Sequence, residues 1–467
     1  MSETTRATQA AAQRAHLTDV GNAERFAFQH GAWARYCHEW RAWLLWDGTH
    51  WEKDAGDGAM RLAKATARGL YDEAAAEVDE DRRKKIAAWA VQSENEKRLR
   101  SMLALAQSEP GIAVRTEALD ADGWALNVLN GTLDLRTGEL RPHRREDLQT
   151  KLVPVAYDPE AMCPLWLATL ERILGGRREL IAYLQKAIGY ALTGVTTEQV
   201  LFVFFGIGAN GKTTILTTAV TMLGDYALST RPETLMMKKG DAIPNDIAQL
   251  KGRRLVIAVE AEPGQRLAEG LVKGMTGGDV MTARFMRSEF FQFTPTFKII
   301  LGTNHRPAIR GTDHAIWRRI RLIPFTVTIP DSEQDRFLTE KLKSEWPGIL
   351  AWAVAGCLAW QREGLGLPDE VKAATEAYRA DMDRLKEFLD ESCVLEAGAQ
   401  LASSELYQSY DAWAHRSNEK PLSQKQFSER LREHGLEKKR AEQGMVWLGI
   451  RFRSFMDTEP AWVTERE

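Results

Sequence analysis

The sequence has few cysteines and no long hydrophobic run, and each shortage excludes a class of protein. Only four cysteines occur in 467 residues, far apart and without a C-x-x-C pair. Neither a zinc site nor a disulfide framework is therefore expected. The longest apolar stretch, near residues 349–360, is too short to span a bilayer. We expect reduced thiols, a cytoplasmic location and no membrane contact.

The sequence also lacks an excess of charge of either sign, because its formal net charge is only −3. Composition alone gives no indication of nucleic acid, so any DNA contact must come from local basic surfaces. The hydrophobic share of 44% and the charged share of 27% are those of an ordinary globular protein. The length allows about three domains at ~150 residues each.

A strand, a glycine-rich loop and a helix are predicted in succession over residues 200–223. The apolar residues 200–205 predict a strand buried on both faces. The loop that follows fits the phosphate-binding pattern G-x-x-x-x-G-K-[ST]. Apolar residues at helical spacing then continue to Gly224, a suitable C-cap. This order predicts a site for ATP and Mg²⁺.

Each part of this motif has a predicted role. The loop backbone would wrap the phosphates at the positive end of the helix. Lys212 would reach the β- and γ-phosphates, and the Thr213 hydroxyl would hold Mg²⁺. The predicted nucleotide-binding residues are Gly206, Gly208, Ala209, Asn210, Gly211, Lys212, Thr213 and Thr214.

Two further apolar strands are predicted to end in polar side chains. The first, from residue 254, ends at Glu260 and is followed by Ala261 and Glu262. ATPases of this class use such carboxylates to hold Mg²⁺ and to polarise the attacking water. Glu260 is the candidate metal-linked acid and Glu262 the candidate base, although the two roles could be exchanged. The second strand ends at Asn304, which would orient the attacking water or contact the γ-phosphate; the alternative is a turn-capping asparagine.

Basic residues between and after these strands suggest contacts with DNA and with a neighbouring subunit. Residues 285–293 predict a hairpin that turns at Arg287, with Arg284 and Lys273 as its other basic groups. In a pore these side chains would bind DNA phosphates; otherwise they are ordinary exposed residues. Arg318 and Arg319 precede another apolar strand, and either could be an arginine finger on a neighbour's γ-phosphate.

The N-terminal 120 residues are predicted to be largely helical. Trp33, Tyr36, Trp40 and Trp43 recur at helical spacing, which favours core packing over a base-stacking platform. Asp47-Gly48 predicts a small hairpin, and residues 58–108 predict helices. Short strands with tight turns are expected over 125–141, and an amphipathic helix over 165–192.

The C-terminal residues 386–456 predict a winged helix, with a capped helix from Ser403, a second helix between Ser423 and Gly435, and a hairpin. Residues 421–455 hold eight Lys/Arg against four Glu, a local charge of +4. The predicted DNA-binding residues are Lys425, Arg432, Lys438 and Lys439. A protein-docking module is the alternative, because fold does not fix function.

Five motifs in order resemble those of superfamily 3 helicases: residues 206–213, 256–262, 273–279, 301–304 and 315–319. More narrowly, the chain is similar to the phage and plasmid primase C-terminal family, which is related to poxvirus and satellite-phage replication helicases. The resemblance covers roughly residues 124–447. It implies an AAA+-type ring, usually a hexamer, that surrounds single-stranded DNA and moves 3′→5′.

By this resemblance Lys212 and Thr213 match the Walker A residues, Glu260 matches the Walker B acid, and Asn304 matches sensor 1. Arg318 or Arg319 matches the finger. The acidic pair departs from the family because it reads Glu-Ala-Glu. No primase motif is evident in the first 120 residues, so a separate primase or replisome partner is implied.

The expected fold is therefore α/β, with an AAA+-type P-loop core, a helical N-terminal region and a C-terminal winged helix. The expected divisions are 1–120, 121–195, 196–330, 331–385, 386–456 and a tail, 457–467. The expected function is an ATP-dependent replicative helicase of a phage or plasmid-type element in a bacterial cell, near the nucleoid, acting on single-stranded and forked DNA. The alternative is a DNA-binding ATPase that acts as a switch or as an origin-binding, ring-assembling factor.

Overall fold

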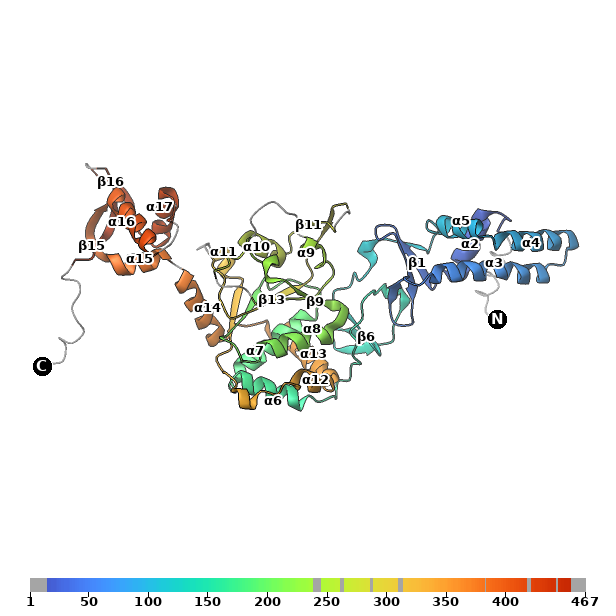
Figure 1. The fold of residues 1–467 in the computed structure, drawn as a ribbon, viewed down its shortest axis with the longest axis horizontal. Coiled ribbons are helices and arrows are strands. Elements are labelled where there is room, and N and C mark those ends of the chain that lie inside the picture. The colour runs from blue at the N-terminus through green and yellow to red at the C-terminus, as the bar shows by residue number, and fades with distance from the viewer. Residues whose placement is uncertain are drawn as a thin grey trace.

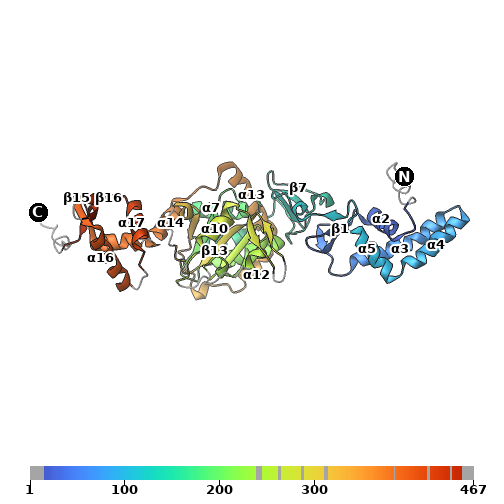
Figure 2. The ribbon, with the colours of Figure 1, turned by 90° about the horizontal axis from the view of Figure 1, so that it is seen from above.

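The computed structural model describes residues 15–237, 245–260, 264–285, 289–309, 314–382, 384–417, 421–441 and 444–454. The fold is mixed α/β. Figures 1 and 2 show three parts in a row: residues 19–114 at one end, a helix-flanked sheet in the middle, and residues 384–452 at the other end.

The N-terminal part combines a helical bundle with a small sheet. Its helices are α2 (Asp19–His30), α3 (Gly58–Ala76), α4 (Glu80–Ser93) and α5 (Glu96–Ala106), so the predicted helices over 58–108 are confirmed. Its strands, in the order β3-β2-β1-β4, are β1 (Ala34–Cys37), β2 (Ala42–Trp46), β3 (Trp51–Lys53) and β4 (Ala113–Val114).

The helical face predicted from the aromatic residues is wrong, because these residues belong to the small sheet. Tyr36 of β1 lies opposite Trp43 of β2, and Trp33 and Trp40 lie in the turns on either side of β1. A spacing of three or four residues also arises where a short hairpin folds two strands together, and periodicity alone does not separate the two cases. The hairpin at Asp47-Gly48 is confirmed by the pairing of Trp46 with Trp51.

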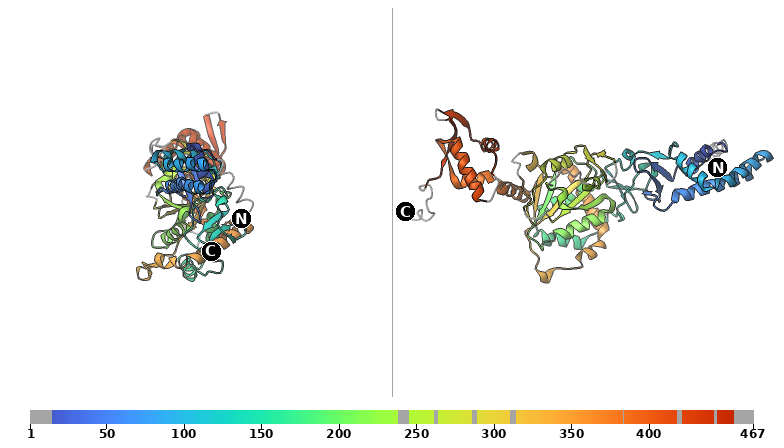
Figure 3. Two further views of the ribbon diagram at one scale, coloured as in Figure 1. Left: turned by 90° about the vertical axis from the view of Figure 1, so that its right-hand side faces the viewer. Right: turned by 45° about the horizontal axis from the view of Figure 1, so that its top comes forward.

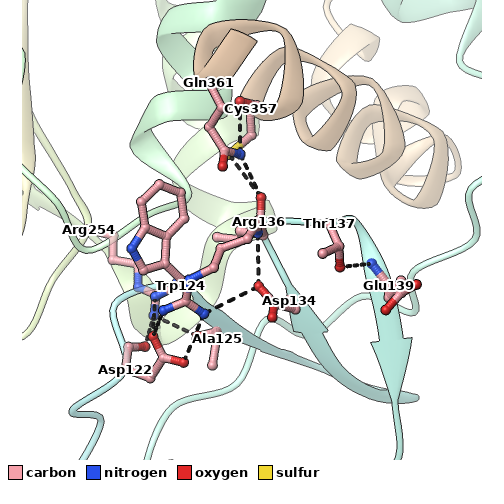
Figure 4. A network of polar contacts seen from close by, with 11 residues as sticks. Asp122, Trp124, Ala125, Asp134, Arg136, Thr137, Glu139, Arg254, Cys357 and Gln361 are labelled. Atoms are coloured by element: carbon pink, nitrogen blue, oxygen red, sulfur yellow. Dashed lines mark hydrogen bonds and ion pairs between the residues drawn. The ribbon is translucent and has the colours of Figure 1, made fainter.

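A second antiparallel sheet leads into the centre of the molecule. Its strands are β5 (Ala125–Val128), β6 (Gly131–Asp134) and β7 (Glu139–Arg141), which confirms the predicted short strands and both turns. Figure 4 shows how polar contacts fasten this sheet to its neighbours. Arg254 donates to the Ala125 carbonyl at 2.7 Å, and Gln361 donates to the Leu135 carbonyl at 2.7 Å. The β5–β7 sheet is therefore tied both to the residue that precedes β10 of the central sheet and to the helix of residues 346–363.

The central sheet is entirely parallel and has the order β14-β8-β13-β10-β9. Apolar side chains fill it on both faces, as expected of a parallel sheet covered by helices on each side. Because all five strands run the same way, their carboxyl ends meet at one edge. The strands are β8 (Leu201–Phe205), β9 (Ala227–Thr230), β10 (Leu255–Val259), β13 (Lys298–Thr303) and β14 (Ile320–Pro324).

Helices cover this sheet, and Figure 3 shows them around it. The helix predicted over 165–192 is split in two, because Gly175 and Gly176 both have positive φ and interrupt it. One hydrophobic cluster extends from β5 and β6 through α6 and α7 to α13. The helices are α6 (Pro164–Ile173), α7 (Arg178–Ala191), α8 (Lys212–Leu223), α9 (Asn245–Ala248), α10 (Glu269–Gly277), α11 (His314–Trp317), α12 (Leu338–Lys343), α13 (Trp346–Glu363) and α14 (Asp369–Met382).

The C-terminal part has its own hydrophobic cluster, with Phe388, Phe427 and Trp447 among its members. Both predicted helices and the hairpin are present, and Ser423 forms a capping box with Gln426. The start of α16 has no side-chain cap, contrary to expectation. Helix α15 and strand β15 were not predicted. The elements are α15 (Arg384–Ser392), β15 (Cys393–Ala402), α16 (Ser403–Arg416), α17 (Gln424–Glu433), β16 (Lys438–Ala441) and β17 (Gly444–Phe452).

Candidate nucleotide-binding site

The glycine-rich loop connects β8 to α8 at the carboxyl edge of the central sheet. It borders a cleft of about 350 Å³. All the predicted nucleotide-binding residues except Gly206 line this cleft, together with Glu260 after β10 and Asn304 after β13. The fold thus brings together residues that lie up to about 100 positions apart in the sequence.

The loop has a shape that few side chains would allow. Gly208 and Gly211 have φ angles of 120° and 77°, and Ala209 also has positive φ. A Cβ at Gly206 would lie 2.4 Å from the Phe325 carbonyl oxygen, too close for any real side chain. Glycine at these positions is therefore a requirement of the backbone path, as expected for a loop that approaches a ligand closely.

Lys212 is the buried cation of the cleft, with 6% of its surface exposed. Its Nζ donates to the carbonyl of Gly206 at 2.7 Å and to the side-chain oxygens of Asn210 at 2.9 Å and Asn304 at 3.0 Å. All three acceptors are neutral. Burial removes the ammonium group from water and so lowers the pKa of Lys212 to about 8, and no carboxylate of the described residues pairs with it. An anion such as a phosphate would supply the missing charge.

Glu260 and Asn304 extend from neighbouring strand ends beside this lysine. Glu260 has a φ of 68°, and its N–H donates to the Gly302 carbonyl at 2.9 Å. Left-handed backbone is rare for a residue with a side chain and costs about 1–3 kcal/mol, and such strain is concentrated at functional sites. Both side chains are exposed in the cleft. Glu262 lies outside the described residues.

A segment after β14 closes the cleft, and the sequence contained no local sign of it. Ile329, Gln334, Asp335 and Leu338 also line the cleft. The Ile329 N–H donates to the Ala209 carbonyl at 2.7 Å, so the segment is fixed to the loop itself. Only the long-range fold reveals this contact, because 120 residues separate its partners.

Arg318 and Arg319 lie at the amino edge of the sheet, away from their own glycine loop. Ile320 pairs with Leu201, at the start of β8. The length of β8, about 16 Å at ~3.3 Å per residue, therefore separates them from the loop. Arg319 is buried, and its Nε donates to the Thr276 hydroxyl at 3.1 Å. Arg318 is exposed and donates to Gln199 at 3.4 Å.

The predicted basic hairpin is present, but its arms lie farther apart in the sequence than expected. Strand β11 (Met281–Ala283) pairs with β12 (Phe291–Phe293). Arg284 is exposed, with its guanidinium 5.0 Å from the centre of the Phe290 ring. Lys273 lies half-buried on α10, and Arg287 lies outside the described residues.

In the C-terminal part, Lys425 and Arg432 are exposed on α17, and Lys439 is exposed on β16. Lys438 donates to the Ser428 hydroxyl at 3.4 Å and lies 5.2 Å from the centre of the Trp447 ring. Burial and the nearby positive charge of Arg432 lower the pKa of Lys438. The four predicted side chains thus come from one helix and the strand that follows it.

Two protein families match this chain. The family described as "D5 N terminal like" matches residues 23–175, and the one described as "Poxvirus D5 protein-like" matches residues 380–453. The chain spans about a third or less of the length of the curated relatives it matches. Within the described ranges, no helix has the length and apolar character needed to cross a membrane.

The relatives are proteins of large DNA viruses. "Putative helicase L207/L206" of Acanthamoeba polyphaga mimivirus is 26% identical over 64% of this chain and 34% of its own. "Putative helicase 022R" of Frog virus 3 is 28% identical over 47% of this chain and 25% of its own. "Putative primase C962R" of African swine fever virus is 26% identical over 64% of this chain and 34% of its own. These relatives give no support to the expected bacterial host.

A solved structure shares the fold. The apo structure of the NrS-1 C terminal region covers 90% of this chain and 96% of its own, with a TM-score of 0.51 and 9% identity. The predicted resemblance to poxvirus-type replication helicases is confirmed by the two family matches. Residues 23–175 and 380–453 thus match two D5-type family models, and the relatives are named as putative helicases and primases, which is consistent with the superfamily 3 helicases that the motifs of this chain resemble.

Proposed function

We propose that this protein is an ATP- and Mg²⁺-dependent replicative DNA helicase built on an AAA+-type P-loop core. The observation that carries the proposal is the cleft itself. A buried lysine, whose hydrogen-bond acceptors among the described residues are all neutral, shares the cleft with Glu260 and Asn304, which follow the ends of two adjacent parallel strands. Such a site is suited to a polyphosphate.

The order of the central strands supports the same assignment. Numbered along the chain, the sheet reads 5-1-4-3-2, so the strand before the glycine loop lies between the fourth and the fifth. Ligands of open α/β sheets bind outside the carboxyl ends of the strands, where the strand order reverses. The glycine loop occupies that position, and α8 presents its amino end to the cleft.

Each residue of the cleft has a proposed part in ATP hydrolysis. Lys212 would neutralise the β- and γ-phosphates, Thr213 and Glu260 would hold Mg²⁺, and Asn304 would orient the attacking water. The bound metal would neutralise charge on the phosphates. Lys212 and Asn304 already contact one another at 3.0 Å, so phosphate would enter a hydrogen-bonded pair that is in place. Glu262 stays a candidate for the base.

We propose that Arg318, not Arg319, is the finger, and that it acts on the next subunit of a ring. Arg318 is exposed and lies a full strand length from its own glycine loop. Arg319 is held inside its own chain by Thr276 and by the Ala315 carbonyl. A ring, a hexamer by the family resemblance, would bring the exposed arginine to a neighbour's cleft.

DNA contacts are proposed at two places. The β11–β12 hairpin would present Arg284 and Arg287, with Lys273 nearby, to single-stranded DNA in the ring. The ring would move along that strand in the 3′→5′ direction. Residues 386–456 would be a winged helix that uses Lys425, Arg432, Lys438 and Lys439 on forked DNA. The other proposed divisions are 1–120, 121–195, 196–330 and 331–385, and a separate primase or replisome protein is the proposed partner.

The test is strand separation on a 3′-tailed fork with ATP and Mg²⁺. Wild type is expected to unwind, and Lys212→Ala is expected to lose both ATP hydrolysis and unwinding. Lys84→Ala, which removes an exposed lysine of α4, is the matched control and should behave as wild type. ATP hydrolysis without unwinding on 3′ and 5′ tails alike would favour a switch or a ring-assembly factor instead.

A further inference from the structure

One face of the small N-terminal sheet carries three tryptophans, each beneath a cation. The guanidinium of Arg145 lies 4.3 Å from the ring centre of Trp33, and that of Arg35 lies 4.8 Å from the ring centre of Trp51. The Nζ of Lys53 lies 4.3 Å from the ring centre of Trp40. Cations are attracted to tryptophan faces, so these pairs are favourable in themselves.

The strand register places these groups on the same side of the sheet. Arg35 of β1 lies opposite Leu44 of β2, and Leu44 lies opposite Lys53 of β3. Two strand spacings, about 10 Å, separate the backbones of Arg35 and Lys53. Arg145 comes from the short helix Arg145–Asp147, and its carbonyl accepts a hydrogen bond from the Trp51 ring N–H at 2.9 Å. Arg145 thus joins the same surface.

No ion pair joins these cations to a carboxylate among the described residues. Arg35 donates to the carbonyls of Gly31 and Ala34, and Arg145 donates to the Ala32 carbonyl at 3.2 Å. Burial and the positive charge of Arg145 lower the pKa of Arg35, and Glu146 offsets part of this effect. The two guanidinium groups therefore lie close enough to repel one another, and neither has an ion-paired carboxylate among the described residues.

Trp33 is also exposed, with half of its surface accessible, whereas Trp51 on β3 is almost completely buried. An aromatic ring that is half open to solvent, beside cations without ion pairs among the described residues, fits a ligand that offers both a ring and a negative charge. A nucleotide offers both. The bases of a duplex are already stacked on one another, so a single strand is the form that fits.

We propose that Trp33, Arg35, Arg145 and Lys53 form a contact for single-stranded DNA outside the central cleft. A base would stack near Trp33, and the cations would bind the adjacent phosphates. The proposal rests on the proposed action on DNA but adds a binding surface to the N-terminal part. The rival explanation is that the cations only stabilise the small sheet.

The experiment measures binding of an oligo(dT) strand to the full chain without nucleotide, by fluorescence anisotropy. Trp33→Ala is expected to weaken binding about tenfold, since stacking on an aromatic side chain contributes ~1–3 kcal/mol per base. Trp33→Phe should retain most of the affinity. Arg145→Gln should weaken binding and reduce the salt dependence by roughly 0.7 in logarithmic slope.

Trp89→Ala is the matched control. Trp89 lies 4.2 Å beneath Arg98, but Arg98 is paired with Asp19 at 2.9 Å, so this second cation–tryptophan pair is neutralised. The Trp89→Ala variant should bind oligo(dT) as wild type does. Photocrosslinking of wild type to oligo(dT) should modify Trp33. If Arg284→Gln weakens binding while every Trp33 and Arg145 variant binds as wild type, this proposal is overturned and the proposed function stands. If wild type binds no single strand, both fail.

Discussion

The central cleft and the C-terminal part both carry basic side chains, but they hold them in opposite ways. Lys212 is buried and fixed by three hydrogen bonds, whereas Lys425, Arg432 and Lys439 extend into solvent. A buried, fixed charge suits chemistry, which depends on position to a fraction of an ångström. Exposed charges suit DNA affinity, which depends mainly on how many phosphates are neutralised. One substitution should therefore matter far more in the cleft than in the C-terminal part.

Two adjacent arginines also differ in burial, but there the exposed one is proposed to act in catalysis, because the cleft that it would serve belongs to a neighbouring subunit. Arg318→Ala is expected to lower the kcat for ATP hydrolysis about 10³-fold, the effect typical of a finger. Arg319→Ala should instead lower the free energy of unfolding by about 1–3 kcal/mol, because it leaves Thr276 and Ala315 without their buried partner. Steady-state ATPase assays and denaturant melts separate the two effects.

Mixing provides the control for Arg318. Subunits with Arg318→Ala keep an intact cleft, and subunits with Lys212→Ala keep an intact arginine, so mixing the two inactive proteins should restore part of the activity. If the mixture stays inactive and Arg319→Ala alone abolishes turnover in folded protein, Arg319 is the finger.

The second prediction concerns the cost of burying Lys212. Below pH 8 both the folded and unfolded states keep the proton, so burying the charged lysine lowers the free energy of unfolding by its full amount. Between about pH 8 and 10.5 the folded state loses the proton first, because burial lowers its pKa to about 8. The free energy of unfolding should then rise with pH by a total of about 2–3 kcal/mol.

Lys212→Met removes the titrating group and serves as the reference. Urea melts of both proteins at pH 7, 8.5 and 10 would measure the effect, and wild type should gain stability relative to the variant as pH rises. Parallel curves would mean that Lys212 is neutralised by a partner, which would weaken the contrast with the C-terminal part.

The third and smallest effect is expected in the C-terminal part. The triple change Lys425→Gln, Arg432→Gln and Lys439→Gln should lower affinity for forked DNA about tenfold and reduce the salt slope, since each phosphate contact contributes ~0.9. ATP hydrolysis without DNA should be unchanged. The matched control changes Arg83, Lys84 and Lys85 to Gln. These exposed residues of α4 carry the same total charge as the three residues changed in the C-terminal part.

The strands and the glycine loop were predictable because each is encoded by a local pattern: an apolar run, a fixed motif and a helical repeat. The helix predicted from the tryptophans at 33, 40 and 43 was wrong, because a tight hairpin and a helix can give the same residue spacing. The strand order, the closing segment near Ile329 and the burial of Arg319 depend on contacts across more than 40 residues. No local pattern encodes such contacts.

The left-handed backbone at Glu260 has a consequence for how this site can evolve. Glycine adopts that conformation freely, whereas glutamate is strained in it by about 1–3 kcal/mol. Selection for thermal stability alone would therefore favour glycine at this position and would discard the carboxylate that faces the cleft. With the Mg²⁺-binding role proposed for Glu260, activity would outweigh stability at this position, and the chain's stability would have to come from its other residues.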